Sequence, residues 1–171
     1  MPDFRLLGPV EVSAGDRLIP LGPVKQRIVL AALLLDAGRP VHLDALVDRV
    51  WGEAPPVGAR DVLYSHLSRI RHLLAEAGTA DQDPRPGKTA QLRRQAGGYL
   101  LDIPAELVDL HRFRRLVEQA RDHDDDVARQ LVLLRTAVRL WRGHALADLT
   151  GNWAARIRAG LEQQRQDAVL S

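Results

Sequence analysis

The most informative absence in this chain of 171 residues is cysteine, of which there is none. Disulfides, thiolate metal sites and a cysteine nucleophile are therefore all excluded. Aromatic residues make up only 4% of the sequence, so a hydrophobic core has to be built mainly from Leu, Val and Ala. No apolar run approaches the length of a membrane span, and residues 1–20 lack the pattern of a signal peptide. These absences predict a cytoplasmic protein with no membrane partner.

Motifs of the common catalytic and cofactor sites are also missing. The six histidines do not cluster, and neither HExxH nor HxxxH occurs. No phosphate-binding loop or dinucleotide fingerprint is present, and the acidic residues at 122–126 lack the distal glutamate of a calcium loop. We therefore expect a protein that is not an enzyme, with no catalytic residue, no metal site and no cofactor.

What the chain does contain is local positive charge. The formal net charge is only +2. Four basic side chains and no acid lie between residues 84 and 101, and three arginines accompany a single aspartate between residues 60 and 72. Two short basic stretches in a nearly neutral chain are typical of a nucleic-acid interface of moderate size.

The first part of the chain has the element order of a DNA-binding fold. Short β-rich pieces broken by Gly and Pro come first, followed by two shorter helical patterns, a long helix and a strand pair. This order predicts an α+β winged helix-turn-helix over residues 1–104, with an N-terminal β-sheet, three helices and a C-terminal hairpin wing. The expected strands are 4–7, 10–13, 17–21, 91–95 and 99–103, with a turn at 96–98, and the expected helices are 23–37, 42–51 and about 57–76.

The long helix at 57–76 has two unlike faces. At about 100° per residue, three of its apolar side chains fall within about 40° of Leu63. The opposite side has no Glu or Lys between Arg60 and His72, although those residues usually fill a solvated face. Its hydroxyl, imidazole and guanidinium groups suit phosphate oxygens and base edges, so we interpret it as a DNA recognition helix; the alternative is an ordinary solvated face. The apolar stripe is Leu63, Leu67, Ile70 and Leu74, and the opposite side is Asp61, Ser65, Ser68 and His72, flanked by Tyr64, Arg69 and Arg71.

The second part of the chain changes to continuous helical periodicity. We expect helices at about 108–121, over 127–149 with Trp141 on the apolar face, and from about 153 to the end. Paired Ala- and Leu-rich helices of this kind resemble a tetratricopeptide-like stack, and the pattern stops without a terminating signal. An all-α, tetratricopeptide-like domain that is truncated is therefore expected over 105–171.

Several segments occur in an order that is typical of one regulator family. They are KQRIVLAALLLDAG, LDALVDRVWGEAPP, ARDVLYSHLSRIRHLL, GGYLL, VDLHRF and AVRLWRGHALADL. The series closely resembles the Streptomyces antibiotic regulatory proteins, in which an OmpR-type winged helix precedes a bacterial transcriptional activation domain. The resemblance implies an activator of antibiotic biosynthetic genes that binds direct repeats in promoter DNA with two protomers side by side. It also implies contact with RNA polymerase holoenzyme, including the principal sigma factor.

Residue chemistry and the resemblance together indicate a DNA-binding set. The long helix would enter the major groove, and the wing would contact the backbone or the minor groove. Many wings of this type have a basic residue directly before the turn, where this chain has Gln95, and alternation sends Arg93 and Arg94 to opposite faces of their strand. Lys25 and Arg27, at a helix start, either bind phosphate or are plain surface charge. The candidate set is Arg60, Tyr64, Ser65, Ser68, Arg69, Arg71, His72, Arg93, Arg94, Gln95, Lys25 and Arg27.

Two functions remain open at this point. The first is a sequence-specific DNA-binding transcriptional activator with no catalysis of its own. The second is a protein–protein interaction or adaptor module whose winged helix is degenerate. Salt-dependent, sequence-specific binding to promoter DNA distinguishes the first function from the second.

Overall fold

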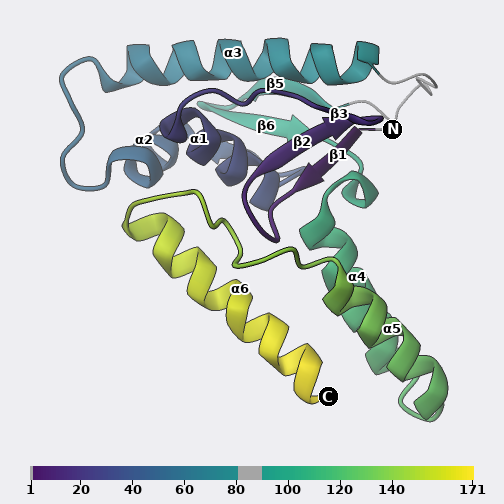
Figure 1. Cartoon of the computed structure of the whole chain (residues 1–171). Helices are drawn as coiled ribbons and strands as arrows, with labels where there is room; N and C mark the ends of the chain where they lie inside the picture. Colours follow the sequence, from purple (N-terminus) through teal and green to yellow (C-terminus); the bar gives the residue numbers. More distant parts are fainter. Residues whose placement is uncertain (1, 81–89) are drawn as a thin grey trace.

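A computed structural model describes residues 2–80 and 90–171 of the chain. In Figure 1 the long helix α3 crosses one side of the molecule, and the three last helices extend from the other side. In chain order the elements are β1 (Pro2–Arg5), β2 (Glu11–Ala14), β3 (Arg17–Leu18), α1 (Val24–Leu35), β4 (Val41–His42), α2 (Leu43–Trp51), α3 (Ala59–Ala80), β5 (Gln91–Gln95), β6 (Gly98–Asp102), η1 (Ala105–Leu107), α4 (Asp109–Asp122), α5 (Val127–Arg139) and α6 (Asn152–Leu170).

The N-terminal sheet has the antiparallel order β1-β2-β3. Its first two strands are displaced by two residues and one residue from their predicted positions, and the third, predicted at 17–21, ends at Leu18. The shortening has a local cause. Ile19 still donates its N–H to the Val12 carbonyl at 2.8 Å, but Pro20 has no N–H with which to continue the ladder.

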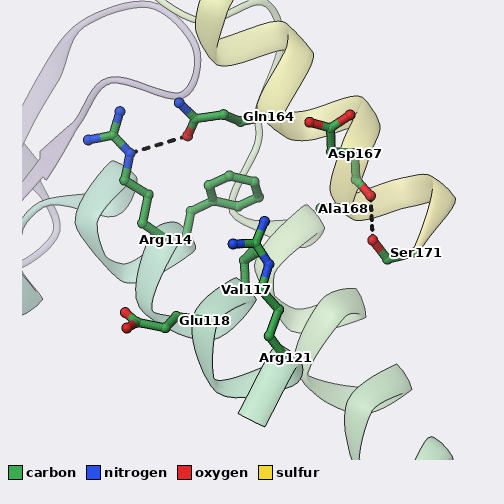
Figure 2. A pocket seen from close by; sticks show the side chains of 9 residues that line it. Arg114, Val117, Glu118, Arg121, Gln164, Asp167, Ala168 and Ser171 are labelled. Atoms are coloured by element: carbon green, nitrogen blue, oxygen red, sulfur yellow. Dashed lines mark hydrogen bonds between the residues drawn. The ribbon is translucent and has the colours of Figure 1, made fainter. Parts of the chain in front are cut away.

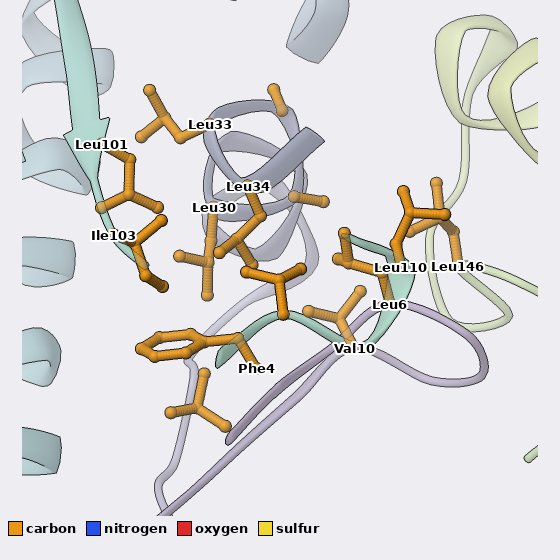
Figure 3. Packing of buried hydrophobic residues seen from close by; sticks show 14 of the residues in the cluster. Phe4, Leu6, Val10, Leu30, Leu33, Leu34, Leu101, Ile103, Leu110 and Leu146 are labelled. Atoms are coloured by element: carbon orange, nitrogen blue, oxygen red, sulfur yellow. The ribbon is translucent and has the colours of Figure 1, made fainter. Parts of the chain in front are cut away.

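The helix α1 is the central buried helix, as its apolar sequence predicts. All seven residues from Ile28 to Leu34 are buried. Figure 3 shows side chains from both parts of the chain around it, including Phe4, Leu101 and Leu110. From Ile28 to Leu34 this helix is apolar on every side and has to be surrounded, and here α2 and α3 pack against it. This packing fixes the two helices of the helix-turn-helix relative to the core.

A second sheet, of order β4-β6-β5, forms the wing and its base. No sequence periodicity reveals β4, because a strand of two residues is too short to show alternation. Gly98 belongs to β6 and not to the turn predicted at 96–98, so the turn contains two residues. A Cβ atom at Gly98 would lie 2.2 Å from the Val41 carbonyl oxygen, so the two strands approach too closely for any larger residue.

The helical part departs from prediction at the end of α5. The helix predicted over 127–149 stops at Arg139, and residues 140–151 form no helix. Trp141 lies beyond the helix, where it is buried with its ring edge-on to Phe113 at 5.5 Å between ring centroids. Leu146 has a φ of 50°, which is incompatible with a continuing α-helix. The prediction of one long helix was wrong here.

The segment 142–148 returns to the winged helix and runs alongside the loop after β1. Three backbone N–H groups of this segment donate to the carbonyl oxygens of residues 6–8 at 2.8–3.3 Å. The carboxylate of Asp148 accepts the N–H of Val10 at 2.9 Å and the guanidinium of Arg27 at 2.6 Å. The apolar residues that gave this stretch its helical spacing therefore cover the N-terminal sheet and α1 instead.

Asp109, the first residue of α4, is a second link between the two parts. Its buried carboxylate accepts backbone N–H groups from Leu6 at 2.7 Å and from Leu7 at 3.0 Å. Burial raises the pKa of this carboxyl, and the two N–H groups counter part of the rise. The predicted boundary after residue 104 separates two sequence patterns, while the hydrophobic core runs continuously across it.

Candidate nucleic-acid interface

The outer face of α3 has the orientation predicted for it. Leu63, Leu67 and Ile70 are at most 1% exposed, and Leu74 is 5% exposed. These side chains face the core, which leaves the opposite side of the helix on the surface along its length (Figure 1). The predicted helix phase is thereby confirmed. The candidate residues on the exposed side are Arg60, Tyr64, Ser65, Ser68, Arg69, Arg71 and His72.

Local capping sets the corner between α2 and α3. The N–H of Asp44 donates to Nδ1 of His42, which caps α2, and the helix ends at Trp51, before Gly52 with a φ of 64°. The carboxylate of Asp44 then accepts the guanidinium of Arg60 at 2.5 Å, at the start of α3. Both side chains are more than half exposed, at 69% and 57%, so this ion pair is weak and releases Arg60 easily to a stronger anion.

Two further cations lie where an approaching anion would meet them. Arg69 is exposed on α3 and makes no hydrogen bond or ion pair with any residue in the described ranges. Lys25 is exposed at the start of α1, and its ammonium lies 5.7 Å from the centroid of the Trp51 ring. Both charges are available to phosphate without the loss of an internal ion pair.

Arg71 differs from these cations because it joins α3 to the wing. Its guanidinium donates to the Leu92 carbonyl at 3.2 Å and lies 6.0 Å from the centroid of the Tyr99 ring. A cation over an aromatic face adds about 0.5–1 kcal/mol at such a partly exposed site. Arg71 therefore orients the wing relative to α3, whatever else it contacts.

The wing is a tight hairpin at the edge of the second sheet. Its turn residues, Ala96 and Gly97, have φ values of 38° and 80°, as a type I′ turn requires at both positions. Arg94 lies opposite Tyr99 and shares its face, which is the side of α3. Arg93 lies on the other face and donates to Asp102 at 3.0 Å. Gln95, beside the turn, is exposed.

Arg27 is partly buried and is held in an ion pair. Its guanidinium pairs with Asp148, and the two side chains are only 28% and 20% exposed. The sequence offered phosphate binding or surface charge for this residue. The structure gives it a partner in the helical part, so Arg27 links the two parts of the chain.

The acidic stretch at 122–126 has a structural use. The Asp126 carboxylate accepts the N–H of Arg129 at 3.1 Å and caps the start of α5. Within residues 2–80 and 90–171, no group of three His, Asp or Glu side chains is placed to hold a metal ion. Over the same residues, no helix has the length and apolar character needed to cross a membrane.

Two family models match the two parts of this arrangement. The model described as transcriptional regulatory protein, C terminal, matches residues 18–85, and the model described as bacterial transcriptional activator domain matches residues 108–171. The transcriptional regulator RedD of Streptomyces coelicolor is 38% identical over 169 residues, which are 98% of this chain and 47% of RedD. The chain belongs to the family of Streptomyces antibiotic regulatory proteins.

Two further proteins are similar to nearly the whole chain. The regulatory protein DnrI of Streptomyces peucetius is 34% identical over 95% of the chain and 58% of its own length. A solved structure of Mycobacterium tuberculosis EmbR in complex with a low affinity phosphopeptide has a TM-score of 0.86 and 35% identity, over 98% of this chain and 43% of EmbR. These matches support a winged helix joined to a helical activator region. The chain spans about half the length of the curated relatives it matches.

One polar contact of this family member was missed by sequence reasoning. His66 is only 6% exposed on the buried side of α3, and its Nδ1 donates to Gln26 Oε1 at 3.2 Å. Burial lowers the pKa of His66, and the nearby charges of Arg69 and Lys25 lower it further. The signals from which this pair could be found are Gln26, next to the apolar run that begins at Ile28, and His66, beside the apolar stripe of α3.

Proposed function

We propose that the chain is a sequence-specific DNA-binding transcriptional activator. Its target genes would direct the biosynthesis of secondary metabolites, in particular antibiotics. The observation that carries this proposal is the exposed face of α3, on which hydroxyl, phenol, guanidinium and imidazole groups stand beside a basic wing. A helix packed on its apolar side and chemically suited to phosphate and base edges on the other fits the major groove of DNA.

Position along α3 divides the proposed contacts. The side chains of Tyr64, Ser65 and Ser68 lie in the first half of the helix and would meet base edges. Arg69 would bind a phosphate or read a guanine, and His72 would lie near the backbone. Two further phosphate contacts would come from helix starts, from Lys25 at the start of α1 and from Arg60 at the start of α3.

The wing contributes unequally in this proposal. Arg94 faces the side of α3, so it is the wing arginine that would contact DNA next to the recognition helix, with Gln95 at the turn. Arg93 is paired with Asp102 on the other face and would serve the wing itself or a more distant phosphate. Arg71 would act mainly by holding the wing in register with α3.

The partners follow from the family in this proposal. The DNA would be a promoter with direct repeats, bound by two protomers side by side, and RNA polymerase holoenzyme with its principal sigma factor would be recruited. The helices α4–α6 would form a tetratricopeptide-like unit for such contacts, with α4 and α5 as its antiparallel pair. The protein would act beside the chromosome in the cytoplasm, without catalysis and without a cofactor.

Fluorescence anisotropy with promoter DNA from neighbouring genes, at two salt concentrations, tests this function. We expect a specific complex whose affinity falls steeply with salt. Ser68→Ala should relax sequence discrimination by about 1–3 kcal/mol, and Arg69→Gln should either do the same or weaken all sequences alike while reducing the salt slope by about 1.

The matched control is Arg129→Gln, an exposed arginine on α5 that should leave both affinity and salt slope unchanged. Absence of a sequence-specific complex at either salt concentration would overturn the proposal. The same absence would favour the alternative, a protein–protein interaction or adaptor module with a degenerate winged helix.

A further inference from the structure

A cleft of about 270 Å³ lies between the helix α6, the C-terminal ends of α1 and α2, and the side of α4 at Arg114. Its walls come from both parts of the chain, and its apolar floor includes Trp153 and Leu161, which are 8% and 2% exposed. Four guanidinium groups line it, from four different segments, with a single carboxylate. These residues are Arg39, Arg49, Arg114, Arg156 and Asp36.

The positive charge in this cleft is not balanced from within the protein. Arg39 and Arg49 share the one carboxylate of Asp36, at 3.2 Å and 3.0 Å. Arg114 donates from Nε to the neutral Gln164 at 3.2 Å, and Figure 2 shows its other two nitrogens pointing away from that contact. Neither Arg114 nor Arg156 has a carboxylate within ion-pair distance among the residues that the structure describes.

Like charges are close enough in this cleft to influence each other. The pKa of Arg114 is lowered by burial and by the charge of Arg39. Burial also lowers the pKa of the neighbouring His111, and the charges of Arg114 and Arg39 add to that effect. An anion bound in the cleft would reduce the repulsion between these positive charges, so the electrostatic potential of the free protein favours anion binding.

We propose that this cleft binds a small anion that carries more than one phosphate group. Arginine forks match phosphate oxygens with two parallel hydrogen bonds each, and four guanidinium groups line this cleft, three from separate helices and one from the loop after α1. The cleft lies beside α6, on the opposite side of the core from α3 (Figure 1), so its arginines are not part of the DNA surface proposed above.

The surroundings of the cleft leave room for the rest of such a ligand. A neighbouring hollow between α2 and α6 shares Arg49, Trp153 and Arg156 with the cleft. A second one between α4 and α6, shown in Figure 2, shares Arg114 and Gln164. Phosphate groups at the arginines and an organic group along α6 would therefore contact both parts of the chain and stabilise their packing.

Inorganic pyrophosphate added to the full chain tests the site, with thermal melting and titration calorimetry at constant ionic strength. We expect binding, and a melting temperature that rises with pyrophosphate concentration. Arg114→Gln and Arg156→Gln should each weaken binding about tenfold, since each removes a charge-assisted contact. The control is Arg115→Gln, the next residue of α4, which does not line the cleft and should bind like the wild type.

A second measurement separates binding from a merely structural role. Without pyrophosphate, Arg114→Gln should leave the melting temperature unchanged or raise it, because the repulsion from Arg39 disappears. A fall in that temperature would assign Arg114 to structure and overturn the proposal. Equal weakening by Arg115→Gln, no binding at constant ionic strength, or displacement of pyrophosphate by promoter DNA would also overturn it. None of these results bears on the DNA-binding function of α3.

Discussion

The carboxylate of Asp109 offers the sharpest test of how the two parts of the chain are held together. It accepts the N–H groups of Leu6 and Leu7, across the boundary between the winged helix and α4. Asp109→Asn keeps one oxygen acceptor but places an amide donor opposite the other N–H. We expect a loss of about 2 kcal/mol in the free energy of unfolding for Asn, from one charge-assisted bond. Asp109→Ala removes the acceptor of three backbone N–H groups, those of Leu6, Leu7 and Leu110, and should cost at least about 4 kcal/mol.

Urea unfolding of the full chain, followed by circular dichroism, measures both losses. The matched control is Asp122→Ala at the exposed end of the same helix, which should change the free energy of unfolding by less than about 0.5 kcal/mol. If Asp109→Ala costs no more than Asp122→Ala, the carboxylate does not hold the two parts together and the reasoning fails.

The pH dependence of this loss has a defined sign. Burial raises the pKa of Asp109 above its unfolded value of 3.8, so the folded protein binds more protons than the unfolded chain between pH 3.8 and the folded pKa. The stability that this residue contributes is therefore fully present below pH 3.8 and falls as pH rises through the folded pKa. The difference in the free energy of unfolding between wild type and Asp109→Ala should therefore become smaller as pH rises. A difference that grows with pH would contradict the assigned shift.

Other outcomes follow from the wing and the buried histidines. Gly98→Ala should destabilise the protein by at least about 2 kcal/mol in thermal melts, because its Cβ would collide with a backbone oxygen at 2.2 Å; a near-neutral melt would show that the strands can separate freely. Burial lowers the pKa values of His66 and His111, so stability that is complete above the unfolded value of 6.5 should be lost as pH falls below it. In urea titrations at several pH values, His66→Gln should lose less stability at low pH than the wild type. An unchanged dependence of stability on pH would contradict the contribution assigned to His66. Arg71→Ala should lower DNA affinity and also destabilise the fold by about 1 kcal/mol, whereas a loss of affinity alone would place Arg71 in the groove and not at the wing.

The long helix α3 could be predicted from the sequence, whereas the two-residue strand β4 could not. The helix α3 shows several turns of apolar spacing, from Leu63 to Leu74, and its burial follows that spacing. The strand β4 has only two residues and offers no pattern. The stretch after Arg139 misled prediction because Ala145, Leu146 and Leu149 have helical spacing, yet they are buried without a helix. Periodicity reports which residues are buried, and it cannot say against which surface.

The part of the candidate interface on α3 could be predicted from residue types and helix periodicity. Exposed Ser65 and Ser68 follow from the helix phase and their residue types. The roles of Arg27 and Arg71 could not be predicted, because their partners lie 121 and 21 residues away in the sequence. The arginines of the cleft beside α6 are equally scattered, so only the folded chain brings them together. The sequence alone does not distinguish an arginine that binds a ligand from one that pairs within the protein, because the difference depends on neighbours in space.

The return of residues 142–148 to the start of the chain also has a consequence for synthesis. Leu6 is synthesised 103 residues before Asp109, the acceptor of its N–H group. Val10 is synthesised 138 residues before its acceptor, Asp148. Contacts of such sequence separation form late and slow folding, since long loops must close first. The loop between β1 and β2 therefore completes its hydrogen bonds only after α5 has been translated. A nascent chain released before residue 148 would leave the ribosome with the N–H of Val10 in this loop lacking its acceptor.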